Sequence, residues 1–125
     1  MIRVLLVDDE KDLTFFVKKN LESKGDYQVR VCNDPRMVVA EVRDFQPHVL
    51  VLDMMMPEVS GEDVAADLRE SKETARLPIV FLTALVKEGE AGSSGNVIGG
   101  QFFVAKPVKI DELIRVIKLA MAQSA

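Results

Sequence analysis

Side chains suited to phosphate and metal chemistry follow four short apolar runs of this sequence. Asp8 and Asp9 follow the first run, and Asp53 follows another. Thr83 and Lys106 follow two later runs. If these runs are parallel strands of one sheet, the side chains meet at its carboxyl edge, where ligands of open α/β sheets bind.

The combination of these residue types predicts a phosphate or metal site. Carboxylates in one place repel each other, and two unit charges ~4 Å apart cost about 4 kcal/mol at an effective dielectric constant of 20. A hard divalent cation, Mg²⁺ above all, offsets that repulsion, and Lys106 supplies a second positive charge. A carboxylate could then attack phosphorus while the cation, Lys106 and the Thr83 hydroxyl stabilise the phosphoryl oxygens. A single Asp after a strand is usually a turn former, so the prediction depends on the whole set.

The elements that must position these side chains are five short apolar runs that alternate with amphipathic stretches. This pattern is typical of a parallel sheet with helices on both faces. The runs at 2–7, 49–52 and 79–82 are almost continuously apolar and are predicted to be central strands. The runs at 27–32 and 102–105 suit flanking positions.

Helical spacing and capping residues predict the helices between the strands. Gly25 is expected just after the end of the first, and Asp34, Ser60 and Asp111 are expected to cap three others. The residues expected to face the core are Leu13, Phe16, Val17 and Leu21; Val38, Val42 and Phe45; Val64, Ala65 and Leu68; and Leu113, Ile114, Ile117 and Met121.

The segment 87–100 contains five glycines, and each costs up to about 1 kcal/mol relative to Ala inside a helix. A fourth helix there is expected to be short or irregular. The segment is either a solvated connection or a mobile element that changes shape, and both interpretations stay open at this point.

Composition narrows the class of protein. The chain has 125 residues, which predicts a single domain over 1–125. A lone cysteine favours a reducing, cytoplasmic location, and no apolar run reaches the ~20 residues of a membrane helix. A net charge of -4 without a basic cluster argues against direct nucleic-acid binding.

Four motifs in order resemble those of the receiver domain of two-component response regulators, the CheY-like family, over essentially the whole chain. They are Leu6-Val7-Asp8-Asp9-Glu10, the loop from Leu52-Asp53 through Pro57 to Gly61, Phe81-Leu82-Thr83-Ala84, and Phe103-Val104-Ala105-Lys106-Pro107. The resemblance implies a doubly wound, flavodoxin-like α/β fold: a five-stranded parallel sheet in strand order 2-1-3-4-5 with five helices.

The resemblance also implies a role for each site residue. Asp53 would accept a phosphoryl group from a sensor histidine kinase or a histidine phosphotransfer protein. Asp8, Asp9, Asp53 and the backbone carbonyl of Met55 would hold Mg²⁺. Thr83 and Lys106 would bind phosphoryl oxygens, and Pro107 would follow a cis peptide.

By the same resemblance, Phe103 is the aromatic residue that swings inward when Thr83 moves toward the phosphoryl group. The output surface would be the fourth helix, fifth strand and fifth helix. Met55 and Leu85 are both apolar beside the site, so we expect slow self-dephosphorylation. The cognate kinase, the output partner, dimerisation on phosphorylation, and whether the chain is a stand-alone receiver are left open by the sequence.

Two other classes of function compete with this signalling switch, which would not turn over an external substrate. An Mg²⁺-dependent phosphatase with an aspartyl nucleophile would need an acid two residues after Asp53, where Met55 stands. A nucleotide-binding module would need a glycine-rich phosphate loop, which the sequence lacks. We interpret His48, Cys32 and the run Met54–Met56 as structural.

Overall fold

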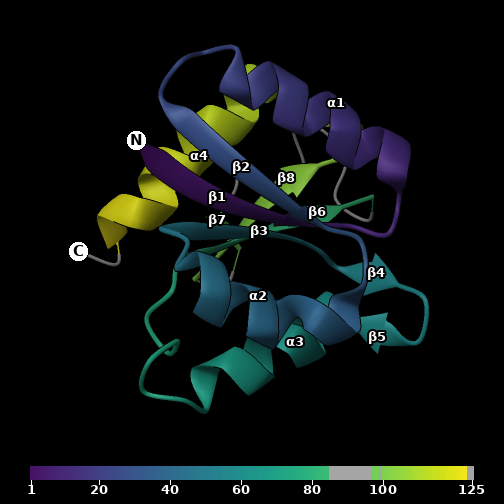
Figure 1. Ribbon diagram of the computed structural model, residues 1–125, viewed down its shortest axis with the longest axis vertical. Helices are drawn as coiled ribbons and strands as arrows, with labels where there is room; N and C mark the ends of the chain where they lie inside the picture. The colour runs from purple at the N-terminus through teal and green to yellow at the C-terminus, as the bar shows by residue number, and fades with distance from the viewer. Residues whose placement is uncertain (85–96, 99, 124–125) are drawn as a thin grey trace.

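The computed structural model describes residues 1–84, 97–98 and 100–123. Five parallel strands lie side by side in the order β2-β1-β3-β6-β8, which confirms the predicted order 2-1-3-4-5 (Figure 1). Their bounds are Ile2–Val7 for β1, Tyr27–Cys32 for β2, Val49–Asp53 for β3, Ile79–Thr83 for β6 and Gln101–Ala105 for β8.

A short strand that the sequence did not predict extends one edge of this sheet. β7 (Val97–Ile98) pairs antiparallel with β8. Within the part of the chain described, β8 therefore pairs with β6 on one side and with β7 on the other.

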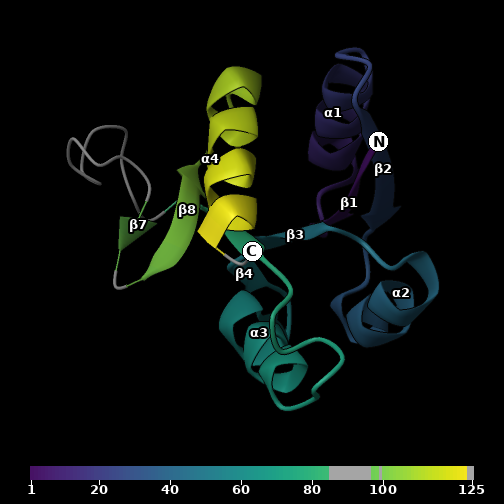
Figure 2. The ribbon, with the colours of Figure 1, turned by 90° about the vertical axis from the view of Figure 1, so that its left-hand side faces the viewer.

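Helices cover both faces of the sheet. α1 (Lys11–Glu22) and α4 (Ile110–Gln123) lie on one face, and α2 (Val38–Phe45) and α3 (Gly61–Arg69) lie on the other (Figures 1 and 2). Side chains of β1 alternate between two cores: Val4 and Leu6 join the core under α1 and α4, while Leu5 and Val7 join the other. Burial on both faces explains the continuous apolar run.

The predicted first helix is present, but one of its predicted core residues is wrong. Phe16 keeps 47% of its surface exposed, and Thr14 is buried instead. The Thr14 hydroxyl donates to the Lys11 carbonyl and accepts from the Asn33 amide, so the core tolerates this polar side chain. Gly25 follows the helix with φ +91°, as its predicted position requires.

The predicted caps have different outcomes. Ser60 accepts a hydrogen bond from the Asp63 N–H and caps α3. Asp34 caps a 3-10 turn (Pro35–Met37) that precedes α2. The prediction that Asp111 caps the last helix is wrong, because the Lys109 carbonyl already accepts from Leu113 and α4 begins before Asp111. The Asp111 side chain is 95% exposed in the first turn.

A short or irregular fourth helix was predicted within 87–100. In that segment residues 97–98 form β7, and residues 87–96 and 99 lie outside the described residues. Among the helices that the structure does describe, none is long and apolar enough to cross a membrane.

Candidate functional site

The carboxyl ends of four neighbouring strands meet at one edge of the sheet. Asp8 follows β1, Asp53 ends β3, Thr83 ends β6 and Lys106 follows β8. The strand register places these ends level, since Val7 pairs with Leu52 and Thr83 with Ala105. Asp8, Asp9 and Asp53 each offer a carboxylate oxygen within 4.8 Å of the others. The structure therefore brings the predicted acidic residues together.

Lys106 lies between these carboxylates. Its Nζ is 3.0 Å from Asp8 Oδ2 and 3.3 Å from Asp53 Oδ1, and only 18% of its side chain is exposed. Burial acts to lower the pKa of Lys106, but pairing with Asp8 and the charge of Asp53 together raise it to about 12. The lysine therefore stays positively charged.

The two buried carboxyls are unfavourable places for negative charge. Burial raises the pKa of Asp8 above its ordinary value, against the opposing effects of the Glu10 N–H and the Lys106 charge. Burial also raises the pKa of Asp53, although Lys106 and the Met55 N–H act in the opposite direction. One ammonium thus compensates only part of the negative charge of three carboxylates.

The residues of this cluster fit a hard divalent cation. Asp8 Oδ2 is buried and faces the Lys106 ammonium, but among the described groups it accepts no hydrogen bond of good geometry. Asp9 is half-buried beside it. Carboxylate oxygens are the ligands that Mg²⁺ takes in proteins. A buried carboxylate oxygen without a hydrogen-bond partner is therefore available as a ligand for such an ion.

A glycine makes room for the loop that carries Asp53. The Gly61 N–H donates to the Met54 carbonyl, and the Met54 N–H donates to Leu82 of the next strand. A Cβ on Gly61 would lie 2.3 Å from the Asp53 carbonyl oxygen. Between them, β4 (Met55–Met56) and β5 (Val59–Ser60) form a small antiparallel hairpin.

Thr83 and Phe103 belong to β6 and β8, the two strands that follow β3 across the sheet. Thr83 is buried at the end of β6. Phe103 is also buried and stacks on Phe81 with ring centroids 5.6 Å apart. The Lys106–Pro107 peptide is cis, as the motif implied. The aromatic ring therefore points inward in this state of the protein.

Two residues of the site were not predicted. Glu10 Oε1 lies 3.2 Å from Lys106 Nζ. The Asn33 amide donates to the Asp8 carbonyl over 2.8 Å and so holds the loop after β1. Signals for both exist in the sequence: Glu10 completes a run of three acids, and Asn33 directly follows a strand, at the same edge of the sheet.

His48 and Cys32 make structural hydrogen bonds. His48 Nδ1 accepts a hydrogen bond from the Arg3 N–H, and burial lowers the pKa of its imidazole. The Cys32 thiol is buried and donates to the Asp34 carbonyl. The Met55 N–H donates to Asp53 Oδ1 over 3.3 Å, and its side chain is exposed. Leu85 lies outside the described residues.

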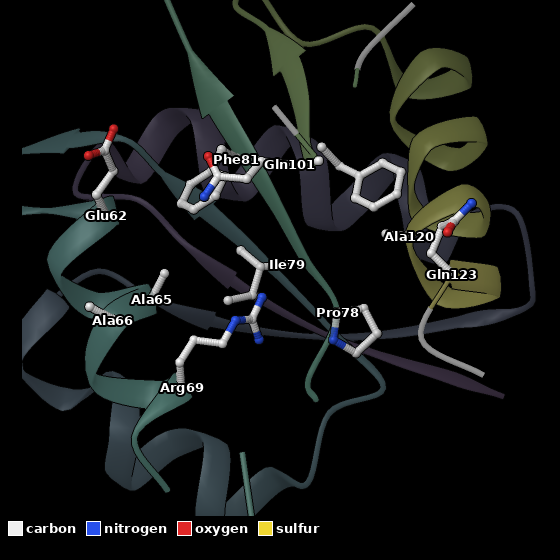
Figure 3. A pocket seen from close by; sticks show the side chains of 12 residues that line it. Glu62, Ala65, Ala66, Arg69, Pro78, Ile79, Phe81, Gln101, Ala120 and Gln123 are labelled. Carbon is white, nitrogen blue, oxygen red and sulfur yellow. The ribbon is translucent and has the colours of Figure 1, made fainter. Parts of the chain in front are cut away.

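A cavity of about 630 Å³ lies away from the acidic cluster (Figure 3). Ile79 and Phe81 of the sheet contribute to its lining, with Glu62 and Arg69 on α3 and Gln123 at the end of α4. None of the clustered carboxylates lines it. Phe81 lines this cavity and also stacks on Phe103.

Comparison with known proteins identifies related sequences and folds. The family model described as the response regulator receiver domain matches residues 4–118. The transcriptional regulatory protein TrcR of Mycobacterium tuberculosis is 38% identical over 113 residues, which cover 90% of this chain and 42% of that protein. The phosphate regulon transcriptional regulatory protein PhoB of Rhizobium meliloti is 32% identical over 122 residues, which cover 98% of this chain and 53% of PhoB.

A solved structure gives the same result for the fold. The receiver domain of the Francisella response regulator 1452 superposes with a TM-score of 0.78 at 26% identity, and the match covers 100% of both chains. The chain spans about half the length of the curated relatives it matches. The matches give no support to the alternative of a phosphatase.

Proposed function

Because this chain belongs to the response regulator receiver domain family, we propose that it is a phosphorylation-dependent switch of a two-component phosphorelay. In this proposal Asp53 accepts a phosphoryl group from a sensor histidine kinase or a histidine phosphotransfer protein. The observation that carries it is the contact of the buried Asp53 carboxylate with Lys106, 3.3 Å away, beside Asp8 and Asp9.

The transfer is a displacement at phosphorus. An oxygen of Asp53 attacks the phosphorus of the phosphohistidine, the N–P bond breaks, and the imidazole nitrogen keeps the electron pair. Lys106 pairs with a phosphoryl oxygen and the Thr83 hydroxyl donates to another, which stabilises the charge as it develops. Mg²⁺, held by Asp8, Asp9, Asp53 and the Met55 carbonyl, would supply further positive charge to the phosphoryl oxygens.

The switch then acts through packing. Phosphorylation adds about -1.5 to -2 charges, which draw Thr83 and Lys106 toward Asp53. Phe103 carries no hydroxyl, so it responds only by changing its packing against Phe81 and its neighbours. The surfaces that would change and bind the output partner are those of β8 and α4. The cytoplasm, where histidine kinases present their phosphohistidine, is the compartment that we propose.

Phosphorylation by acetyl phosphate in Mg²⁺ tests the proposal. Intact-protein mass spectrometry should show the addition of one phosphoryl group, and chelation of Mg²⁺ with EDTA should abolish it. Asp53→Asn should remove the labelling, because an amide is not a nucleophile toward phosphorus. Asp67→Asn, which changes an exposed carboxylate on α3, should label like the unsubstituted protein. Labelling that survives in Asp53→Asn would reject the assignment.

A further inference from the structure

The Lys106 ammonium is shared by three carboxylates. Its Nζ lies 3.0 Å from Asp8, 3.2 Å from Glu10 and 3.3 Å from Asp53. The ammonium donates a hydrogen bond to Glu10 Oε1, whereas Asp8 Oδ2 lies within ion-pair distance but accepts no N–H from it. A phosphoryl oxygen that pairs with Lys106 must therefore compete with these carboxylates for the ammonium, and with Glu10 for an N–H donor.

The three contacts differ in how firmly they are held. The side chains of Asp8 and Asp53 are almost completely buried, whereas that of Glu10 is 63% exposed. The backbone of Glu10 is fixed, because its N–H donates to Asp8 Oδ1 and its carbonyl accepts from the Thr14 N–H. Of the three carboxylates, that of Glu10 can turn into solvent, where it is well hydrated. The loss of its exposed ion pair with Lys106 costs little free energy.

We propose that Glu10 is a displaceable counter-ion of Lys106: it holds the ammonium in the unphosphorylated protein and yields its place to a phosphoryl oxygen. This inference rests on the proposed function of Asp53. Glu10 is a positioning residue, since it acts on the phosphoryl group through Lys106. The exchange replaces one anionic partner of the ammonium by another and needs no proton transfer.

The first test is the rate of labelling by acetyl phosphate in Mg²⁺. Glu10→Gln removes the competing charge and keeps the size of the side chain. We therefore expect the maximal labelling rate to rise about two- to fivefold, which is the factor that corresponds to the free energy of one exposed ion pair. Glu10→Ala should behave alike. Asp12→Asn removes the same charge from the exposed first turn of α1 and controls for general attraction of an anionic donor; it should leave the maximal rate unchanged.

The second test observes Lys106 directly by NMR of the lysine side-chain ammonium group. Glu10→Gln should shift the Lys106 signal in the unphosphorylated protein. With beryllofluoride and Mg²⁺ added, the Lys106 signals of the variant and the unsubstituted protein should coincide, because Glu10 has already left. A purely structural role of Glu10 would shift the signal equally in both states.

Several outcomes would overturn the inference. They are an unchanged or lower maximal rate in Glu10→Gln, an equal increase in Asp12→Asn, and a Lys106 shift that persists with beryllofluoride. Failure of the proposed function looks different, because in that case the unsubstituted protein would neither label at Asp53 nor respond to beryllofluoride.

Discussion

Replacing Asp53 by Asn should make the protein more stable when no divalent cation is present. Asp53 is buried, and its carboxylate shares a small space with those of Asp8 and Asp9. Lys106 is the cation that the structure places in contact with it. The amide of Asn has nearly the same shape and can still accept the hydrogen bond from the Met55 N–H, so the substitution changes mainly the charge.

The distances give the size of the effect. The carboxylate oxygens of Asp8, Asp9 and Asp53 lie within 4.8 Å of one another, and at that limit two carboxylates repel by about 3.5 kcal/mol at an effective dielectric constant of 20. A carboxylate and an ammonium 3.3 Å apart attract by about 5 kcal/mol. Asp53→Asn relieves two such repulsions and loses one such attraction, so the free energy of unfolding should rise by about 2 kcal/mol. Removing a buried charge acts in the same direction.

The gain should depend on pH with a definite sign. Burial raises the pKa of Asp53 in the folded protein above the ordinary value of 3.8. The unsubstituted protein therefore loses stability as the pH rises through that raised pKa, since the folded state resists ionisation. The gain from Asp53→Asn should be largest above the raised pKa and should vanish as the pH falls below 3.8, where Asp53 is neutral in both states.

Urea unfolding in EDTA at several pH values measures this difference. The chain has no Trp, so the transition is best followed by circular dichroism. Added Mg²⁺ should narrow the gap, because the ion binds the folded unsubstituted protein more tightly than the variant. Asp67→Asn, an exposed carboxylate, should change stability by less than about 0.5 kcal/mol. A less stable Asp53→Asn protein in EDTA at neutral pH would refute the reasoning.

Two further predictions test the positioning of the site. Gly61→Ala places a Cβ 2.3 Å from the Asp53 carbonyl oxygen, so the backbone must shift. We expect the free energy of unfolding in urea to fall by about 1–3 kcal/mol, and labelling by acetyl phosphate to become slower. Unaltered labelling would contradict the close approach of the two backbone segments. Phe103→Ala removes a buried ring stacked on Phe81 and should cost about 3–5 kcal/mol in the same assay. Below the unfolding transition Phe103→Ala should still label at Asp53, and loss of labelling in the folded variant would show that the ring also shapes the site.

The sheet and the acidic cluster were predictable because the pattern of apolar runs in the sequence fits few other folds. Continuous apolar runs of four residues in β1, β3 and β6, between amphipathic stretches, fit a sheet buried on both faces. Once the strands are parallel, their carboxyl ends share one edge, so Asp8, Asp53 and Lys106 must approach each other. Their contacts follow from topology and need little knowledge of side-chain detail.

The errors concern a polar residue in the core and the choice of a helix cap, which each involve one or two hydrogen bonds. Thr14 and Phe16 lie two residues apart in α1 and therefore point to different sides of the helix. Thr14 faces the core, where the Asn33 amide satisfies its hydroxyl, and Phe16 is left exposed. Asp111 was expected to cap α4, but the first turn forms on the Lys109 carbonyl instead. Such choices are worth about 1 kcal/mol each, which is less than sequence patterns can distinguish.

The electrostatics of the site connect its stability with its proposed action. Asp8, Asp9, Glu10 and Asp53 carry more negative charge than Lys106 can neutralise, and the burial of Asp8 and Asp53 prevents water from screening it. Repulsion of this kind lowers the stability of the folded chain, but it also makes the site responsive to added charge. A cation relieves the repulsion, and a phosphoryl group on Asp53 draws Lys106 away from its present partners. Because Glu10 is the exposed member of the group around Lys106, we expect the rearrangement to begin there.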